Sequence, residues 1–195
     1  MRGARASLPL VALLLASSCT SYEYEEEVFL DISGSGRIRI SGSRAILSSL
    51  HGIEDPTVES LRAHFASAGL EPVSTLQTWR NGRAFLHLEL RFASFPLLCR
   101  SAPFRERRCE LSVSTEDQRL LLESPRPAGP PRGDVDRAGV LALRFHLPST
   151  VRYHNSPTGV ERGNILSWEQ GVGEYFESAP FPVEVRYGLR SVLAV

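Results

Sequence analysis

Residues 73–92 read VSTLQTWRNGRAFLHLELRF, and this stretch has a clear hairpin pattern. Asn81-Gly82 favours the positive φ angles that a two-residue hairpin turn needs. After the turn every second side chain is apolar, in the order Ala84, Leu86, Leu88, Leu90 and Phe92. The side chains between them include His87 and Glu89, so one face is buried and the other meets water. The stretch predicts two antiparallel strands, 73–79 and 84–92.

More strands are expected on both sides of this hairpin. An opening hairpin pairs 28–32 with 37–40 around the Ser-Gly turn at 33–36. Alternating apolar segments follow at 109–113, 120–122, 141–147, 151–155, 163–169 and 182–193. No helical crossover separates these segments. We therefore expect the α+β class, with a mostly antiparallel, curved β-sheet and one or two helices packed on one of its faces.

Two helices are predicted between the first two hairpins. A short helix at 43–50 ends at Gly52. The longer one covers 56–68, with Asp55 as the cap, Pro56 in the first position and a glycine after its end. Its apolar side chains recur every three to four residues and share one face, namely Val58, Leu61, Phe65 and Ala68.

The N-terminus is typical of a bacterial lipoprotein signal peptide over residues 1–18. Arg2 and Arg5 precede an apolar run from Leu8 to Ala16, which is shorter than the roughly 20 residues that span a bilayer. Small residues then lead to Cys19, whose thiol is expected to carry the lipid. Two alternatives stay open: cleavage near Ser18, which releases a soluble secreted protein, and a retained anchor helix.

The pattern predicts an exported protein, anchored on the extracytoplasmic side of a membrane that is either the inner or the outer one. Residues 19–27 form a lipidated tether, although their acidic part could also begin the first strand. Residues 28–195 form one α+β domain with a proline- and glycine-rich loop at 125–133. Without Arg2 and Arg5 the chain has 20 basic and 22 acidic residues, which argues against binding to nucleic acid.

Cys99 and Cys109 remain for other chemistry if Cys19 is lipidated. In an oxidising compartment they could form a disulfide, and the alternative is two separate small apolar side chains. His146 and His154 bracket a turn but lack a third metal ligand nearby in the sequence. No known catalytic spacing occurs. We therefore expect no metal, no cofactor and no enzymatic activity.

The segment 145–155, FHLPSTVRYHN, and the segment 163–168, GNILSW, resemble a pattern of bacterial envelope lipoproteins. They have an apolar strand, a proline turn, a strand that ends in asparagine, and a glycine-led strand with tryptophan. The chain resembles the LppM-like lipoprotein domain over about residues 138–169. The resemblance implies an α+β domain on the membrane surface and suggests binding of envelope lipids or glycolipids. The family has no established catalytic residues to carry over.

Three aromatic residues are candidate contacts. Trp79 and Phe85 flank the hairpin turn, where they could face a membrane or partner or simply pack against a helix. Trp168 either belongs to the core or lines an apolar ligand groove. The leading hypothesis is a lipid-anchored module that binds an envelope lipid or another amphiphile. The alternatives are an assembly lipoprotein that contacts a membrane protein and, more remotely, an unrecognised hydrolase.

Overall fold

The computed structural model describes residues 22–104, 106–125, 127, 129–178 and 182–189. The expected signal peptide and Cys19 lie outside these residues. None of the described helices is both long and apolar enough to cross a membrane.

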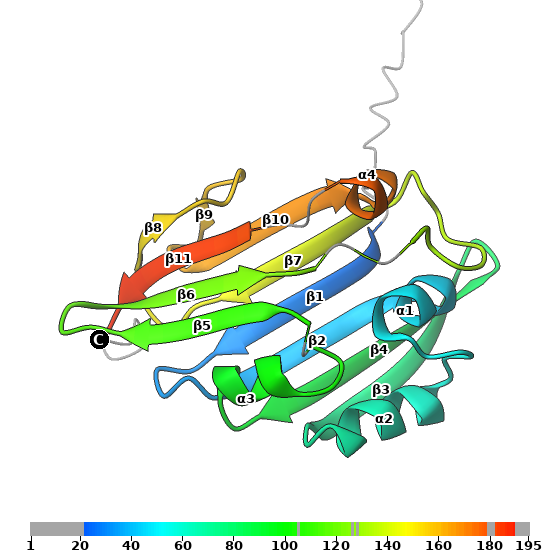
Figure 1. The fold of residues 1–195 in the computed structure, drawn as a ribbon, viewed down its shortest axis with the longest axis horizontal. Helices are drawn as coiled ribbons and strands as arrows, with labels where there is room; N and C mark the ends of the chain where they lie inside the picture. The colour runs from blue at the N-terminus through cyan, green and yellow to red at the C-terminus, as the bar shows by residue number, and fades with distance from the viewer. Residues whose placement is uncertain (1–21, 105, 126, 128, 179–181, 190–195) are drawn as a thin grey trace, which may run out of the picture.

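A seven-stranded sheet, here called sheet A, forms one layer of the molecule (Figure 1). Neighbouring strands are antiparallel except β1 and β7, which run parallel. In spatial order the strands are β3 (Glu71–Arg80), β4 (Arg83–Phe92), β2 (Gly36–Ser43), β1 (Tyr22–Leu30), β7 (Val140–His146), β10 (Ile165–Gly171) and β9 (Val160–Glu161).

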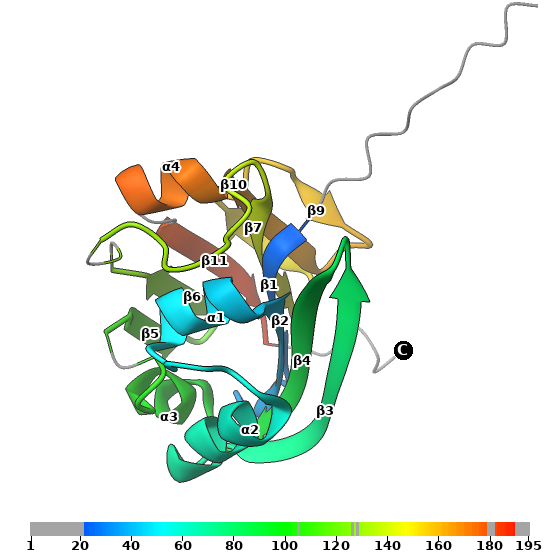
Figure 2. The ribbon, with the colours of Figure 1, turned by 90° about the vertical axis from the view of Figure 1, so that its right-hand side faces the viewer.

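A second layer covers the inner face of sheet A (Figure 2). One part is a four-stranded antiparallel sheet, sheet B, with the order β5 (Arg108–Val113), β6 (Asp117–Glu123), β11 (Pro182–Gly188) and β8 (Val151–His154). The other part is helical, with α1 (Arg44–His51), α2 (Val58–Ser67) and α3 (Phe95–Arg100). A last short helix, α4 (Val172–Glu177), follows β10. The expected α+β class and mostly antiparallel pairing are confirmed, and sheet B is an addition to the expected single sheet.

The core lies between the two layers. Fully buried side chains from sheet A include Ile38, Ile40, Leu86, Leu90 and Phe145. They face equally buried side chains of the covering layer, including Leu47, Phe65, Phe95, Leu120 and Val185. The strands of sheet B form a separate layer that stacks on sheet A. Only this stacking removes the apolar face of sheet B from water.

The hairpin of β3 and β4 forms as predicted. Arg80 pairs with Arg83 in register, and the turn residues Asn81 and Gly82 have φ angles of 49° and 76°. These are the left-handed conformations that a tight hairpin turn requires. The apolar alternation after the turn places its set of side chains against the core.

Two expected boundaries were wrong. The second helix begins at Val58, and its cap is Thr57, whose hydroxyl and backbone N–H exchange hydrogen bonds with Ser60. This reciprocal pair satisfies two free N–H groups, and Asp55 instead pairs with Arg44. The tether does not extend to residue 27, because β1 begins at Tyr22 and its acidic residues pair with β2 and β7.

Candidate functional site

A cavity of about 460 Å³ lies between the two layers. Strand β1 contributes Tyr24 and Glu26 to its floor, and β7 contributes Leu141 and Leu143. These residues come together because β1 and β7 are parallel neighbours whose inward side chains align, with Glu26 in register with Leu143. The volume falls within the roughly 300–1,000 Å³ of small-molecule sites in proteins.

The opposite wall comes from the covering layer. Helix α1 supplies Leu50 and His51, α2 supplies His64, and the segment between α3 and β5 supplies Phe104 and Arg107. The start of the proline-rich loop, at residues 125 and 127, also borders the cavity. The walls therefore combine apolar and polar side chains in similar measure, so the cavity suits a ligand that has both an apolar and a polar part.

A buried ion pair forms the polar centre of the cavity. Arg107 donates from Nη1 to Glu26 Oε1 at 2.6 Å and from Nη2 to Oε2 at 2.9 Å. Only 2% of the Glu26 side chain and 15% of the Arg107 side chain are exposed. Burial would raise the pKa of Glu26, but the charge and hydrogen bonds of Arg107 outweigh it and lower that pKa. Burial would lower the pKa of Arg107, but the attraction to Glu26 outweighs burial and raises that pKa.

Tyr24 and His51 extend this centre. The Tyr24 hydroxyl donates to Glu26 Oε2 at 2.9 Å and lies 3.3 Å from His51 Nε2. Burial raises the pKa of Tyr24 well above its ordinary value, so the hydroxyl keeps its proton. Burial, aided by the nearby charge of Arg107, lowers the pKa of His51 to about 3, so the imidazole is neutral at neutral pH.

His64 supplies a polar atom without an internal partner. Its Nε2 is buried and has no hydrogen-bond partner among the described residues. Burial lowers the pKa of this side chain, which favours the neutral ring. A ligand that carries a hydroxyl or carbonyl group could satisfy this nitrogen.

At neutral pH each of these groups stays in one protonation state. Glu26 is ionised and paired, Tyr24 is protonated, and His51 is neutral. General acid–base catalysis works best with a pKa near the working pH, and the three shifts move away from it.

The structure links Cys99 of α3 to Cys109 of β5 by a disulfide with a Cα–Cα distance of 5.9 Å. The bond encloses the segment that carries Phe104 and Arg107, so it helps to hold that segment over the cavity. Among the described residues, no three side chains of the His, Cys, Asp and Glu types gather in a possible metal site.

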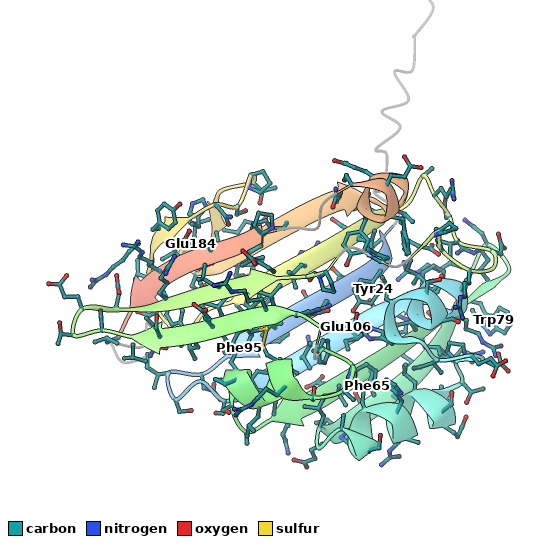
Figure 3. The ribbon with its side chains drawn as sticks, viewed as in Figure 1. Tyr24, Phe65, Trp79, Phe95, Glu106 and Glu184 are labelled. Carbon is teal, nitrogen blue, oxygen red and sulfur yellow. A yellow bond between two sulfur atoms is a disulfide. The ribbon has the colours of Figure 1, made fainter. Side chains whose placement is uncertain are left out.

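The three candidate aromatic residues lie in different surroundings. Trp79 is 67% exposed at the end of β3, away from the cavity (Figure 3). Phe85 is only 2% exposed, since the guanidinium groups of Arg80 and Arg83 cover its ring at 4.5 and 5.7 Å. The expectation that Phe85 could be an exposed contact was therefore wrong.

Trp168 lies in the core rather than in a groove. It is 3% exposed and packs edge-to-face on Phe145, with 6.1 Å between the ring centroids. It is not among the residues that line the cavity. Its inward neighbour on β7, Leu143, does reach the cavity, so one strand separates Trp168 from that space.

Sequence reasoning missed the polar centre of the cavity. Its signal was present in β1, where the inward positions read Tyr24, Glu26, Val28 and Leu30. A carboxylate in an otherwise apolar row is rarely buried without a partner. The partner could not be found in the same way, because Arg107 is 81 residues away and is one of many arginines.

No protein-family model and no curated protein matches this sequence. A search of solved structures matched the folded domain of the Mycobacterium tuberculosis LppM protein, determined by NMR. The match has a TM-score of 0.50 and 11% sequence identity, and it covers 87% of this chain and 91% of that chain. The predicted resemblance is thus confirmed for the fold: this chain has an LppM-like fold.

Proposed function

We propose that the protein is a lipid-anchored envelope protein whose domain binds one small amphiphile in the cavity between its two layers. The observation that carries the proposal is the cavity itself, whose walls combine apolar side chains with polar ones around the Glu26–Arg107 centre. The LppM-like fold and the lipoprotein-type N-terminus both support an envelope location. Since two acyl chains anchor a protein stably, a lipidated Cys19 would keep the cavity beside its membrane ligands.

The charges of the cavity disfavour an anionic group on the ligand, since Glu106 also lines it. Arg107 is matched by Glu26, and His51 stays neutral. A phosphate would therefore meet no unmatched arginine among the lining residues, and it would have to compete with Glu26 for Arg107. A hydroxyl-bearing head group fits better, because His64 Nε2 and the Tyr24 hydroxyl can form hydrogen bonds with it.

Native mass spectrometry of the chain purified from its own host's envelope tests the proposal. The wild-type chain is expected to carry a bound amphiphile. Leu50→Trp should lose it, because the larger ring fills the cavity from a partly exposed position on α1. Val113→Trp is the matched control, since Val113 is exposed on β5 and lies outside the cavity lining. A wild-type chain without ligand in repeated preparations would contradict the proposal.

The anchor needs its own experiment. Cys19→Ala removes the thiol that would be acylated and is expected to move the protein from the membrane fraction to the soluble fraction. Fractionation of host cells followed by immunoblotting measures this change. If Cys19→Ala leaves the distribution unchanged, the lipid anchor is wrong, whereas the ligand experiment can still succeed on the released domain.

A further inference from the structure

Four strands lie at the ends of the two sheets, and β3 differs from the other three. Strand β9 has two residues, β8 has four, and β5 carries Arg108 and Glu110 within its six. Short or charged edges of this kind discourage pairing with another chain. Strand β3 has ten residues, and its stretch 74–79, STLQTW, has neither a charge nor a proline. Among the described strands, the edge at β3 is therefore the one that is open to pairing.

The hairpin turn shows which backbone groups of β3 face outward. Arg80 and Arg83 flank a two-residue turn, so they are the first hydrogen-bonded pair of the ladder. Hydrogen-bonded and non-hydrogen-bonded pairs alternate in an antiparallel ladder. The N–H and C=O groups of Thr75, Gln77 and Trp79 therefore point away from β4, towards the free edge.

The exposed apolar side chains of β3 have an internal symmetry. Val73 is 43% exposed, Leu76 is 59% exposed, and Trp79 is 67% exposed. They follow one another at intervals of three residues, with Leu76 in the centre. An antiparallel copy of the same strand, centred on Leu76, presents the same three residues in reverse order.

We propose that β3 pairs antiparallel with β3 of a second copy of this chain, around a two-fold axis at Leu76. The outward groups of Thr75 then exchange hydrogen bonds with those of Gln77 in the second copy, and the reverse pair forms by symmetry. Leu76 of each copy contacts the other. Trp79 reaches the bulge at Val73 in the second copy. The pairing is strand addition to a free sheet edge, with the apolar residues setting the register.

The charges at the ends of β3 agree with this arrangement. Glu71 begins the strand and Arg80 ends it, and both are exposed, while Glu71 also pairs with Arg91 and Arg80 also covers the Phe85 ring. Antiparallel pairing brings Glu71 of one copy near Arg80 of the other. A two-fold axis at Gln77 instead of Leu76 would place Leu76 opposite Thr78 and separate the two leucines. The register centred on Leu76 therefore buries the exposed apolar side chains of β3 best.

A cysteine at the axis tests the pairing in the full chain within host cells. In Leu76→Cys the two thiols would face each other in a non-hydrogen-bonded pair, about 4.5–5.5 Å apart between Cβ atoms, close enough for a disulfide after a small shift. We expect a covalent dimer on non-reducing gels. Val113→Cys is the control, because Val113 is 66% exposed on an edge strand of sheet B. Equal cross-linking of both variants, or none in Leu76→Cys, would overturn the proposal.

Leu76→Lys provides a test without cross-linking. It places two like charges directly opposite each other at the axis, so the dimer should dissociate about fivefold more readily. Sedimentation of the full chain in mild detergent measures this, with Val113→Lys as the control. A wild-type chain that stays monomeric would refute the pairing. Quenching of Trp79 fluorescence by brominated phospholipids, in the absence of a dimer, would refute it too and assign this edge to the membrane surface.

Discussion

Each face of sheet A carries a glutamate–arginine ion pair, and the two pairs differ in how deeply they are buried. On the outer face Glu25 pairs with Arg144, and both side chains are about one quarter exposed. On the inner face Glu26 pairs with Arg107 and is almost completely enclosed. Consecutive glutamates of one strand thus lie at a partly exposed surface and in the protein interior. Because the effective dielectric constant differs between the two faces, removal of one partner should have very different consequences.

The largest effect is expected from Glu26→Gln. The amide keeps some hydrogen bonds but leaves the Arg107 cation buried without a counter-charge, which costs about 3–5 kcal/mol of unfolding free energy. Denaturant unfolding measures the loss. Glu25→Gln is the matched control on the outer face, with an expected change of about 1 kcal/mol or less. Equal losses in the two variants would remove the distinction between the faces.

The stability that the Glu26–Arg107 pair contributes should also depend on the disulfide between Cys99 and Cys109. Replacement of Cys99 and Cys109 by alanine is expected to cost about 2–4 kcal/mol, because it frees a loop in the unfolded chain. The loop carries Arg107, so this change and Glu26→Gln should together cost less than the sum of their separate effects. The Arg144 pairs lie outside this loop, and Glu25→Gln should be additive with the cysteine change. A double-mutant cycle by denaturant unfolding distinguishes the two cases.

The pH dependence of stability should also differ between a histidine on the inner side of sheet A and one on its outer face. His51 has a pKa of about 3 in the folded protein and about 6.5 in an unfolded chain. Between these values the unfolded chain binds the extra proton, so stability falls as the pH falls, by about 1.4 kcal/mol per pH unit. His51→Phe should remove this slope between about pH 6 and pH 4, as measured by denaturant unfolding.

His87 provides the comparison from the outer face. Partial burial lowers its pKa, and its Nε2 lies 2.8 Å from the Thr78 hydroxyl. Its half-buried position makes the shift smaller than that of His51, so His87→Gln should change the pH slope less. A larger change of the pH slope for His87→Gln than for His51→Phe would contradict the conclusion that His51 is the more deeply buried imidazole.

The smallest effect is expected for Arg144→Gln. Arg144 contacts Glu25, Glu27 and Glu169, all of which are partly exposed. Exposed ion pairs contribute about 0–1 kcal/mol each, and salt screens them. The loss should therefore be about 1 kcal/mol and shrink at high ionic strength. A loss as large as that of Glu26→Gln would show that the outer network carries much of the stability.

Local patterns predicted the local elements well. The hairpin of β3 and β4 depends on the Asn81-Gly82 turn and on alternation within one strand, and both are properties of adjacent residues. Helix α1 ends at Gly52, which adopts a φ of 67°, as expected for a C-terminal glycine. The start of α2 was predicted less well, because Asp55 and Thr57 are both acceptable caps. The choice depends on Ser60 and on Arg44, which binds Asp55.

The candidate site could be predicted only in fragments. Trp79 was correctly suspected of exposure, but Phe85 beside the same turn is covered by two arginines that the local pattern does not place there. The alternation of apolar and polar residues around Trp168 is the same for a residue in the core and for one that lines a groove, so this pattern does not distinguish the two. The position of the cavity on the other side of Leu143 decides between these alternatives.

The sequence alone predicted most of the strands, the β3–β4 hairpin turn and the α+β class, because these follow from residues that are close in the chain. The lipoprotein-type N-terminus with Cys19 stays a prediction. The tertiary structure alone decided the parallel pairing of β1 with β7, the stacking of sheet B on sheet A, and the meeting of Glu26 with Arg107. The pairing of β1 with β7 and the ion pair of Glu26 with Arg107 join residues about 80 or more positions apart. They form where two apolar faces exclude water together, and no local pattern encodes which faces will meet.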